Sequence, residues 1–465
     1  MSALLTQTEE EAQRPLTPTE IFKITAARET TLARLLMLYI STGLFFMLLP
    51  GTFLGVWNLL AISSRRAANS ALPAWIQAHG HAQIFGWIGT FILGIGFYSI
   101  PKLRRIHSLE LSVVWVTWGL WTSGVTLRWL TNVYQWHWRA LLPLSAALEL
   151  AAFVIFFRTI SGHRPQHSGK EKLEEWIFVV IAGSVGLLLT LLVNLGATLY
   201  LSLWGTSPGV PASFDQSFLV LQTWGFLVPI VWGFSAKWLP IFLGLRPVRG
   251  RLLLLAVVLN SLAVLAAFLS RTSVAALFLL AGITFAVHAL GLLELPDRPP
   301  KVKGAHSSFP SFVRIAYVWA LVAAGLGIWA ASVIRSQGIW GASRHALTAG
   351  FLATMVVAIG QRVLPAFAGR SLFSTKLMFV ALLLLTAGCM LRVSSEILAY
   401  QGFFRPAWSW LPLSAVTEMI AVSLFAINLF LSFARRPPSV SVWSSGGLQP
   451  GSLVPLVKLQ SRNPG

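Results

Sequence analysis

The stretch IFGWIGTFILGIGFYSIPKL, at residues 84–103, decides how the chain is organised because two related stretches follow it. These are TWGFLVPIVWGFSAKWLPIF at residues 223–242 and TAGFLATMVVAIGQRVLPAF at residues 348–367. In each stretch a glycine precedes a proline by fifteen residues: Gly86 and Pro101, Gly225 and Pro240, Gly350 and Pro365. A fixed register of this kind predicts an internal repeat of three units.

The surroundings of these stretches are those of an integral membrane protein. The chain has 465 residues, of which 55% are hydrophobic and 11% charged, and its mean hydropathy is +0.72. About 20 apolar residues are needed to cross a hydrocarbon core as a helix. Runs of that kind occupy residues 35–60, 78–100, 110–130, 139–158, 176–204, 216–243, 252–270, 273–295, 313–334, 344–365, 377–398 and 409–433. The sequence therefore predicts an all-α membrane domain of twelve transmembrane helices.

A second pair of motifs supports the repeat. Thr122-x-Gly124-x-x-Leu127-Arg128 recurs as Thr386-x-Gly388-x-x-Leu391-Arg392, and LPLSAALE, ending at Glu149, recurs as LPLSAVTE, ending at Glu418. We therefore expect three four-helix arcs around a pseudo-threefold axis, with binding sites where neighbouring arcs meet. The alternative is chance, since Gly and Pro are frequent in membrane helices.

Charge predicts the topology and limits the partners. Most of the 35 Lys and Arg residues fall inside if both termini are cytoplasmic, as the positive-inside rule requires. We expect a cytoplasmic segment at 1–34, the membrane domain at 35–434 and a disordered cytoplasmic tail at 435–465. The net charge of +20 is dispersed between apolar runs, which argues against nucleic-acid binding. The lipid bilayer is the expected partner, and one cysteine, Cys389, excludes a disulfide framework within the chain.

The candidate metal ligands are histidines near the outer ends of the second and tenth predicted helices, at residues 78–100 and 344–365. His81 lies twenty residues before Pro101, and His345 lies twenty residues before Pro365. The two histidines therefore occupy equivalent positions of the repeat, and a pseudo-threefold axis directs them into different spaces between the arcs. His79 is two residues earlier, about 200° around the helix, and is the natural partner of His345. Neutral imidazole binds haem iron well. We expect a bis-histidine haem between the two helices; the alternative is two interfacial histidines bonded to backbone or headgroups.

At these residues the sequence resembles the NnrS family, within the superfamily of haem-copper oxidase catalytic subunits. The resemblance covers about residues 35–434 and is carried by the H-x-H motif at 79–81, the F-G-W motif at 85–87 and the HALT motif at 345–348. It implies haem b held by His79 and His345, and a link to bacterial nitric-oxide stress in the inner membrane. It also implies that the usual binuclear centre is missing. Ser343 stands where the oxidases have their high-spin haem ligand, and spans 216–243 and 252–270 contain no histidine for copper.

Other polar residues have two interpretations each. His81 binds copper or a second haem, or is a hydrogen-bonded core residue. Arg128 and Arg392 bind haem propionates, or extend to lipid headgroups. Glu149 and Glu418 relay protons, or each neutralises the arginine of its own repeat.

Three functions remain after this reasoning. The leading hypothesis is a haem protein in nitric-oxide tolerance or in electron transfer from a respiratory donor. The second is a divergent oxidase or nitric-oxide reductase-like subunit, and the third is a haem-free transporter that uses the repeat as a substrate path. Whether the protein is an enzyme stays open at this point.

Overall fold

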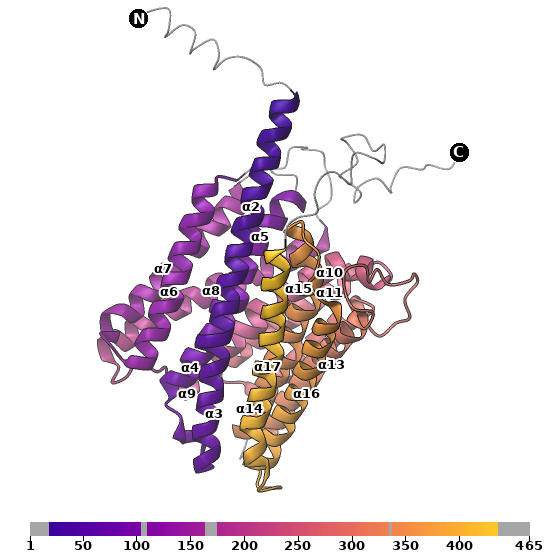
Figure 1. The fold of residues 1–465 in the computed structure, drawn as a ribbon. Coiled ribbons are helices and arrows are strands. Elements are labelled where there is room, and N and C mark those ends of the chain that lie inside the picture. The colour runs from indigo at the N-terminus through magenta and orange to yellow at the C-terminus, as the bar shows by residue number, and fades with distance from the viewer. Residues whose placement is uncertain (1–17, 104–108, 163–173, 334–336, 436–465) are drawn as a thin grey trace, which may run out of the picture.

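The computed structural model describes residues 18–103, 109–162, 174–333 and 337–435, and every regular element within these ranges is a helix. The helices lie side by side in a single bundle (Figure 1). They combine into twelve rods, each of which overlaps one of the predicted spans. Of the predicted N-terminal segment 1–34 and the predicted tail 435–465, residues 1–17 and 436–465 lie outside the described residues.

Four of the rods are built from several consecutive pieces. Rod 1 is α2 (Pro18–Phe46), η1 (Met47–Phe53) and α3 (Leu54–Arg65), and rod 2 is α4 (Pro73–His81), η3 (Ala82–Gly89) and α5 (Thr90–Leu103). Rod 6 is α9 (Ala212–Val220), η4 (Leu221–Leu227) and α10 (Val228–Leu243), and rod 10 is α14 (Gln337–His345), η5 (Ala346–Ala353) and α15 (Thr354–Phe367).

The other rods are single helices. They are α6 (Leu111–Tyr134), α7 (Trp138–Gly162), α8 (Glu175–Trp204), α11 (Gly250–Phe268), α12 (Thr272–Ala289), α13 (Phe309–Ser332), α16 (Thr375–Tyr400) and α17 (Ala407–Ala434). The short 3-10 turn η2 (Ala68–Ser70) connects rods 1 and 2. The first rod begins at Pro18, well before the predicted start at residue 35, so the expected N-terminal segment is partly helical and continuous with the span.

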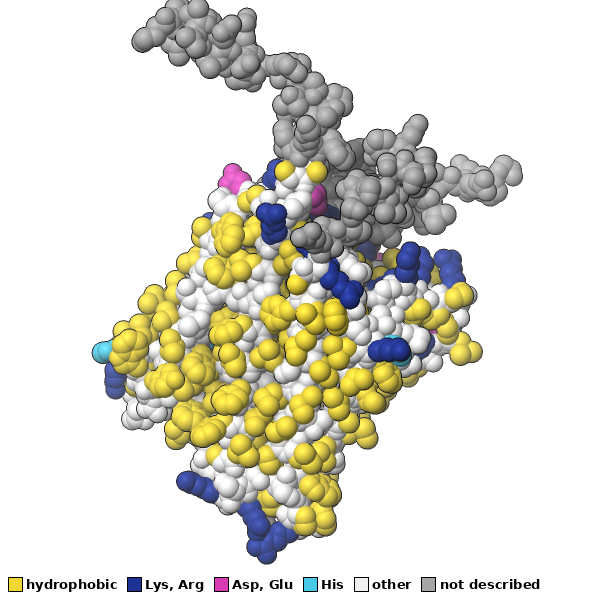
Figure 2. All heavy atoms as spheres, viewed as in Figure 1, with side chains coloured by type: hydrophobic (Ala, Val, Ile, Leu, Met, Phe, Trp, Pro, Cys, Tyr) yellow, Lys and Arg dark blue, Asp and Glu magenta, His cyan; other side chains and the backbone are white. Residues whose placement is uncertain are grey.

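The bundle has the surface of a multi-pass membrane protein. Within the described residues, 11 helices are long and apolar enough to cross a membrane, and α6 is the rod not among them. Apolar side chains cover the flank of the bundle, while Lys and Arg gather toward its two ends (Figure 2). The coarse prediction of an all-α membrane protein is therefore confirmed. The arrangement of a haem-copper oxidase subunit stays a prediction.

The three repeat helices form the centre of the bundle. We compare the most apolar 18-residue stretch of each candidate span. The buried share of its residues is 83% in rod 2, 56% in rod 6 and 72% in rod 10, whereas it is 33–44% in the other spans. Each central rod contains a π-helical segment, η3, η4 or η5, that begins nineteen residues before the proline of its repeat. The sequence repeat is thus also a repeat of local backbone geometry.

The two co-registered motifs occupy equivalent places as well. The helices after each central rod pair most extensively with each other: α6 with α7, α11 with α12, and α16 with α17. A Cβ on Gly124 would lie 2.7 Å from Cγ of Glu149, and one on Gly388 would lie 2.8 Å from Cγ of Glu418. Glycine is needed at both positions because the helices of the hairpin approach so closely, and this shared contact confirms that the motifs are structural equivalents.

Candidate functional site

A cavity of about 1300 Å³ opens between the central rods. Its lining includes residues of α4, α9 and α14, which lie toward the end of the bundle opposite the start of α2 and the end of α17 (Figure 1). The volume exceeds the roughly 300–1,000 Å³ of a site for one drug-sized ligand. It therefore has room for a large cofactor and a smaller ligand together.

His79 enters the cavity from α4. Its Nδ1 lies 2.8 Å from the carbonyl oxygen of Gly51 in η1. Because a carbonyl only accepts hydrogen bonds, Nδ1 carries the proton, and the lone pair on Nε2 is left for a ligand. Gly55 makes room for the ring, since a Cβ there would lie 2.7 Å from Cε1 of His79.

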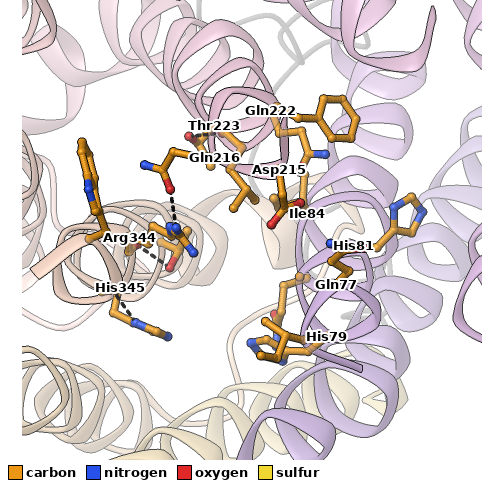
Figure 3. Close-up of a pocket in the computed structure, with 18 of the residues that line it drawn as sticks. Gln77, His79, His81, Ile84, Asp215, Gln216, Gln222, Thr223, Arg344 and His345 are labelled. Atoms are coloured by element: carbon orange, nitrogen blue, oxygen red, sulfur yellow. Dashed lines mark hydrogen bonds between the residues drawn. The ribbon is translucent and has the colours of Figure 1, made fainter. Parts of the chain in front are cut away.

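His345 enters from α14 on the opposite side (Figure 3). Its Nδ1 lies 2.9 Å from the carbonyl oxygen of Gly341 and 3.1 Å from Oε2 of Glu396. Its Nε2 lies 3.4 Å from Nη2 of Arg392. Arginine only donates, so Nε2 is the acceptor and Nδ1 again carries the proton. Both histidines are therefore held as the tautomer whose Nε2 can bind a metal.

Arg392 and Glu396 complete the wall around His345. The arginine Nε lies 3.5 Å from Oε2 of Glu396, and the two side chains are 7% and 9% exposed. Nη1 of Arg392 is buried without a hydrogen-bond partner among the described residues. A buried guanidinium with unused donors is costly, and an anionic group at this position would offset that cost. His79 is near enough to interact electrostatically with both His345 and Arg392.

His81 points away from this side of the cavity (Figure 3). Its Nε2 lies 2.7 Å from Oε1 of Glu149, with the two side chains 7% and 0% exposed, and its ring stacks on Phe85 at 4.5 Å between centroids. No group of three or more His, Cys, Asp or Glu side chains within the described ranges could hold a metal ion. Copper or a second haem at His81 therefore stays a prediction from the sequence.

Each repeat glutamate interacts electrostatically with the arginine of its own repeat, Glu149 with Arg128 and Glu418 with Arg392, but no direct ion pair joins either pair among the described residues. Glu149 contacts His81, and Arg392 contacts Glu396. The reason is proximity: an imidazole reaches Glu149 first, and Glu396 is one helical turn after Arg392 on the same face. Arg128 is 3% exposed and interacts electrostatically with Glu149 and Asp215. Arg128 thus lies near Glu149 and His81 and not beside His345. Its predicted role at a haem propionate stays a prediction.

Within the described residues, the other histidines do not line the cavity. His137 is exposed in the turn before α7, with φ of 42°. His288 is exposed beside Arg249, whose Nη1 donates to its carbonyl oxygen at 2.9 Å. Ser343 donates to the carbonyl oxygen of Ala323 at 2.7 Å and is thus engaged with α13. His107, His163 and His167 lie outside the described residues.

Four polar residues of the cavity did not emerge from the sequence: Asp215, Gln216, Arg344 and Glu396. The i, i+4 spacing from Arg392 could have indicated Glu396. Asp215 and Gln216 have no repeat counterpart, and no pattern singled them out. The sequence placed Arg344 beside His345 but could not show that it enters the same cavity.

A family model matches the last part of the chain. Residues 303–433 match a family described as a domain of unknown function, DUF8744. The matched part begins before α13, ends within α17, and includes His345, Arg392, Glu396 and Glu418. No curated protein matches the chain. The chain is therefore similar to this family over its last helices, and its function has to be inferred from the site.

Proposed function

We propose that the protein binds haem b between His79 and His345. The observation that carries the proposal is the pair of histidines facing one cavity from opposite sides, each with Nδ1 held by a backbone carbonyl. A hydrogen bond from the other ring nitrogen to a carbonyl orients a ligating imidazole and raises its basicity. The sequence register and the local hydrogen bonding thus favour the same two ligands.

The surrounding residues fit the charge of the cofactor. Arg392 is next to His345 and has an unused buried donor, Nη1, which suits a haem propionate. Glu396 holds both Arg392 and His345 and so positions the ligand and the counter-charge together. Arg392 also donates to Nε2 of His345, so this contact has to give way when iron is bound. Bound haem would supply one-electron redox chemistry.

The cellular role follows from the resemblance to the NnrS family. We place the protein in the bacterial inner membrane with both termini cytoplasmic, on the distribution of Lys and Arg, and in nitric-oxide tolerance or electron transfer from a respiratory donor. A reductase-like centre is less well supported. Ser343 is bonded to the backbone, and no three-ligand metal group is found among the described residues.

A haem-free transporter is the second candidate. The large cavity between the repeats favours it, together with the buried charges Arg128, Arg392 and Glu149. Intramembrane charges of this kind commonly mark substrate paths. Purified protein that contains no iron and still binds a solute would support this candidate.

The test is the optical spectrum of the detergent-purified full chain. We expect a low-spin haem spectrum that is lost in His79→Ala and in His345→Ala. His288→Ala is the matched control, since that histidine is exposed and outside the cavity, and its spectrum should be unchanged. An unaltered spectrum in both ligand variants would contradict the assignment.

A further inference from the structure

The segment between α12 and α13 carries two leucines that the fold leaves outside its core. Leu293 and Leu295 are 69% and 89% exposed. The segment begins where α12 ends, at Ala289, so both leucines lie close to the level at which this span leaves the bilayer. It projects sideways from the flank of the bundle (Figure 1). Two apolar side chains are thus presented together near the membrane surface, whereas a single exposed leucine would need no explanation.

Glu294, between the two leucines, is held against the protein. Its Oε2 lies 2.7 Å from Nη2 of Arg246, and its Oε1 lies 2.8 Å from Nη2 of Arg249. Both arginines belong to the segment between α10 and α11. The two ion pairs fasten the middle of the Leu-Glu-Leu stretch while the leucines on either side stay outside.

Backbone hydrogen bonds fix the residues that follow. The amide of Arg298 donates to the carbonyl oxygen of Gly244 at 3.2 Å, and the amide of Lys301 donates to that of Phe242 at 2.9 Å. A surface that is fixed before it binds loses less conformational entropy on binding. The leucines and the basic side chains are therefore presented by a preorganised segment.

The same surface has an excess of positive charge. Its carboxylates are Glu294 and Asp297, together with Glu175, which lies beside Gly250 at the start of α11. The cations around them are twice as many: Arg246, Arg249, Arg251, Arg298, Lys301 and Lys303. The three cations within residues 298–303 are exposed, and no ion pair joins them to another described residue. Their charge is available to a partner.

We propose that residues 293–303 form a surface that binds anionic phospholipid in the adjacent leaflet. The two leucines enter the boundary between headgroups and acyl chains, and the three unpaired cations contact the headgroup phosphates. Basic residues directly beside a transmembrane helix attract anionic lipid, and apolar side chains among them add affinity in proportion to the area they bury. Zwitterionic lipid offers the same apolar boundary without net charge, so the excess of cations selects the anionic class. None of these residues lines the cavity, and the surface does not depend on haem.

The experiment places a polarity-sensitive maleimide fluorophore at position 295 of the full chain. Leu295→Cys is made in a Cys389→Ser background, labelled, and reconstituted into phosphatidylcholine liposomes that contain a minor fraction of brominated phosphatidylglycerol or of brominated phosphatidylcholine. We expect the blue-shifted emission of an apolar environment. We also expect brominated phosphatidylglycerol to quench it about twofold more strongly than brominated phosphatidylcholine, with the difference falling as salt is raised.

Two further variants make the result decisive. The triple variant Arg298→Gln, Lys301→Gln, Lys303→Gln should lose the preference for brominated phosphatidylglycerol, and it keeps the backbone bonds because these use main-chain groups. Phe178→Cys is the matched control: this side chain is 46% exposed near the start of α8, beside Glu174 and Glu175, and the two brominated lipids should quench a fluorophore there equally. Water-like emission at position 295 would mean that the leucines serve another partner. That result, or equal quenching by the two lipids at this position, would overturn the proposal.

Discussion

At the scale of single residues, the site depends on glycines as much as on histidines. Gly51 supplies the carbonyl that fixes the tautomer of His79, and Gly55 leaves the space that its ring occupies. Opposite, a Cβ on Gly341 would lie 1.8 Å from Oε1 of Glu396, so the residue that holds His345 could not stay in place. The absence of these side chains allows the helices to approach closely enough to orient the imidazoles.

Gly55→Ala tests this dependence. The added methyl would overlap Cε1 of His79 at 2.7 Å and turn the ring from its bond to Gly51. Loss of such an orienting contact lowers metal-site affinity by about 10- to 100-fold, so we expect the haem content per chain to fall at least tenfold. Gly119→Ala is the control, since nothing lies within 4 Å of a Cβ there. Full haem content in Gly55→Ala would show that the ring does not depend on this space.

At the scale of elements, a π-helical segment occurs in each of the three central rods, and rod 1 contains a further one, η1. Such segments are rare and tend to occur at functional sites. Here η3, η4 and η5 share one register relative to the repeat prolines, and two of them directly follow His81 and His345. A wider turn changes the direction in which all preceding residues project, so the segments set where the cavity-facing residues of α4 and α14 point.

Deletion of Ala349 tests the role of η5. Removing one residue from a π segment allows ordinary α-helical bonding, and the part before it then shifts relative to the rest by the difference between a π turn and an α turn. His345 would then leave the cavity, so we expect the low-spin spectrum to disappear while the helical circular dichroism is retained. Deletion of Ser371, which is exposed in the segment between α15 and α16, should leave the spectrum intact. Haem binding that survives the loss of Ala349 would mean that η5 does not orient the ligand.

At the scale of the whole molecule, the start of α2 and the end of α17 lie at the same end of the bundle (Figure 1). This arrangement agrees with an even number of spans. The cavity lies toward the other end, near α4 and α14. If the positive-inside rule holds for this chain, the cavity opens on the periplasmic side.

Cysteine labelling tests that orientation. Cys389 is buried and can be replaced by serine to give a background without cysteine. Arg65→Cys, at the exposed end of α3, should react with a membrane-impermeant maleimide in intact spheroplasts. Lys301→Cys, in the exposed segment between α12 and α13, should react only after permeabilisation. The reverse pattern would place the cavity on the cytoplasmic side.

The sequence by itself determined the twelve helices, the threefold repeat and the register of the histidines. These features depend on apolar length and on spacing along a helix, which are local properties of the chain. Only the tertiary structure decided that Glu396 holds His345, that His81 takes Glu149, and that Arg344 and Asp215 share a cavity with Arg128. Those contacts depend on how each helix is rotated against its neighbours and on where the π segments turn it, and apolar patterning does not specify either.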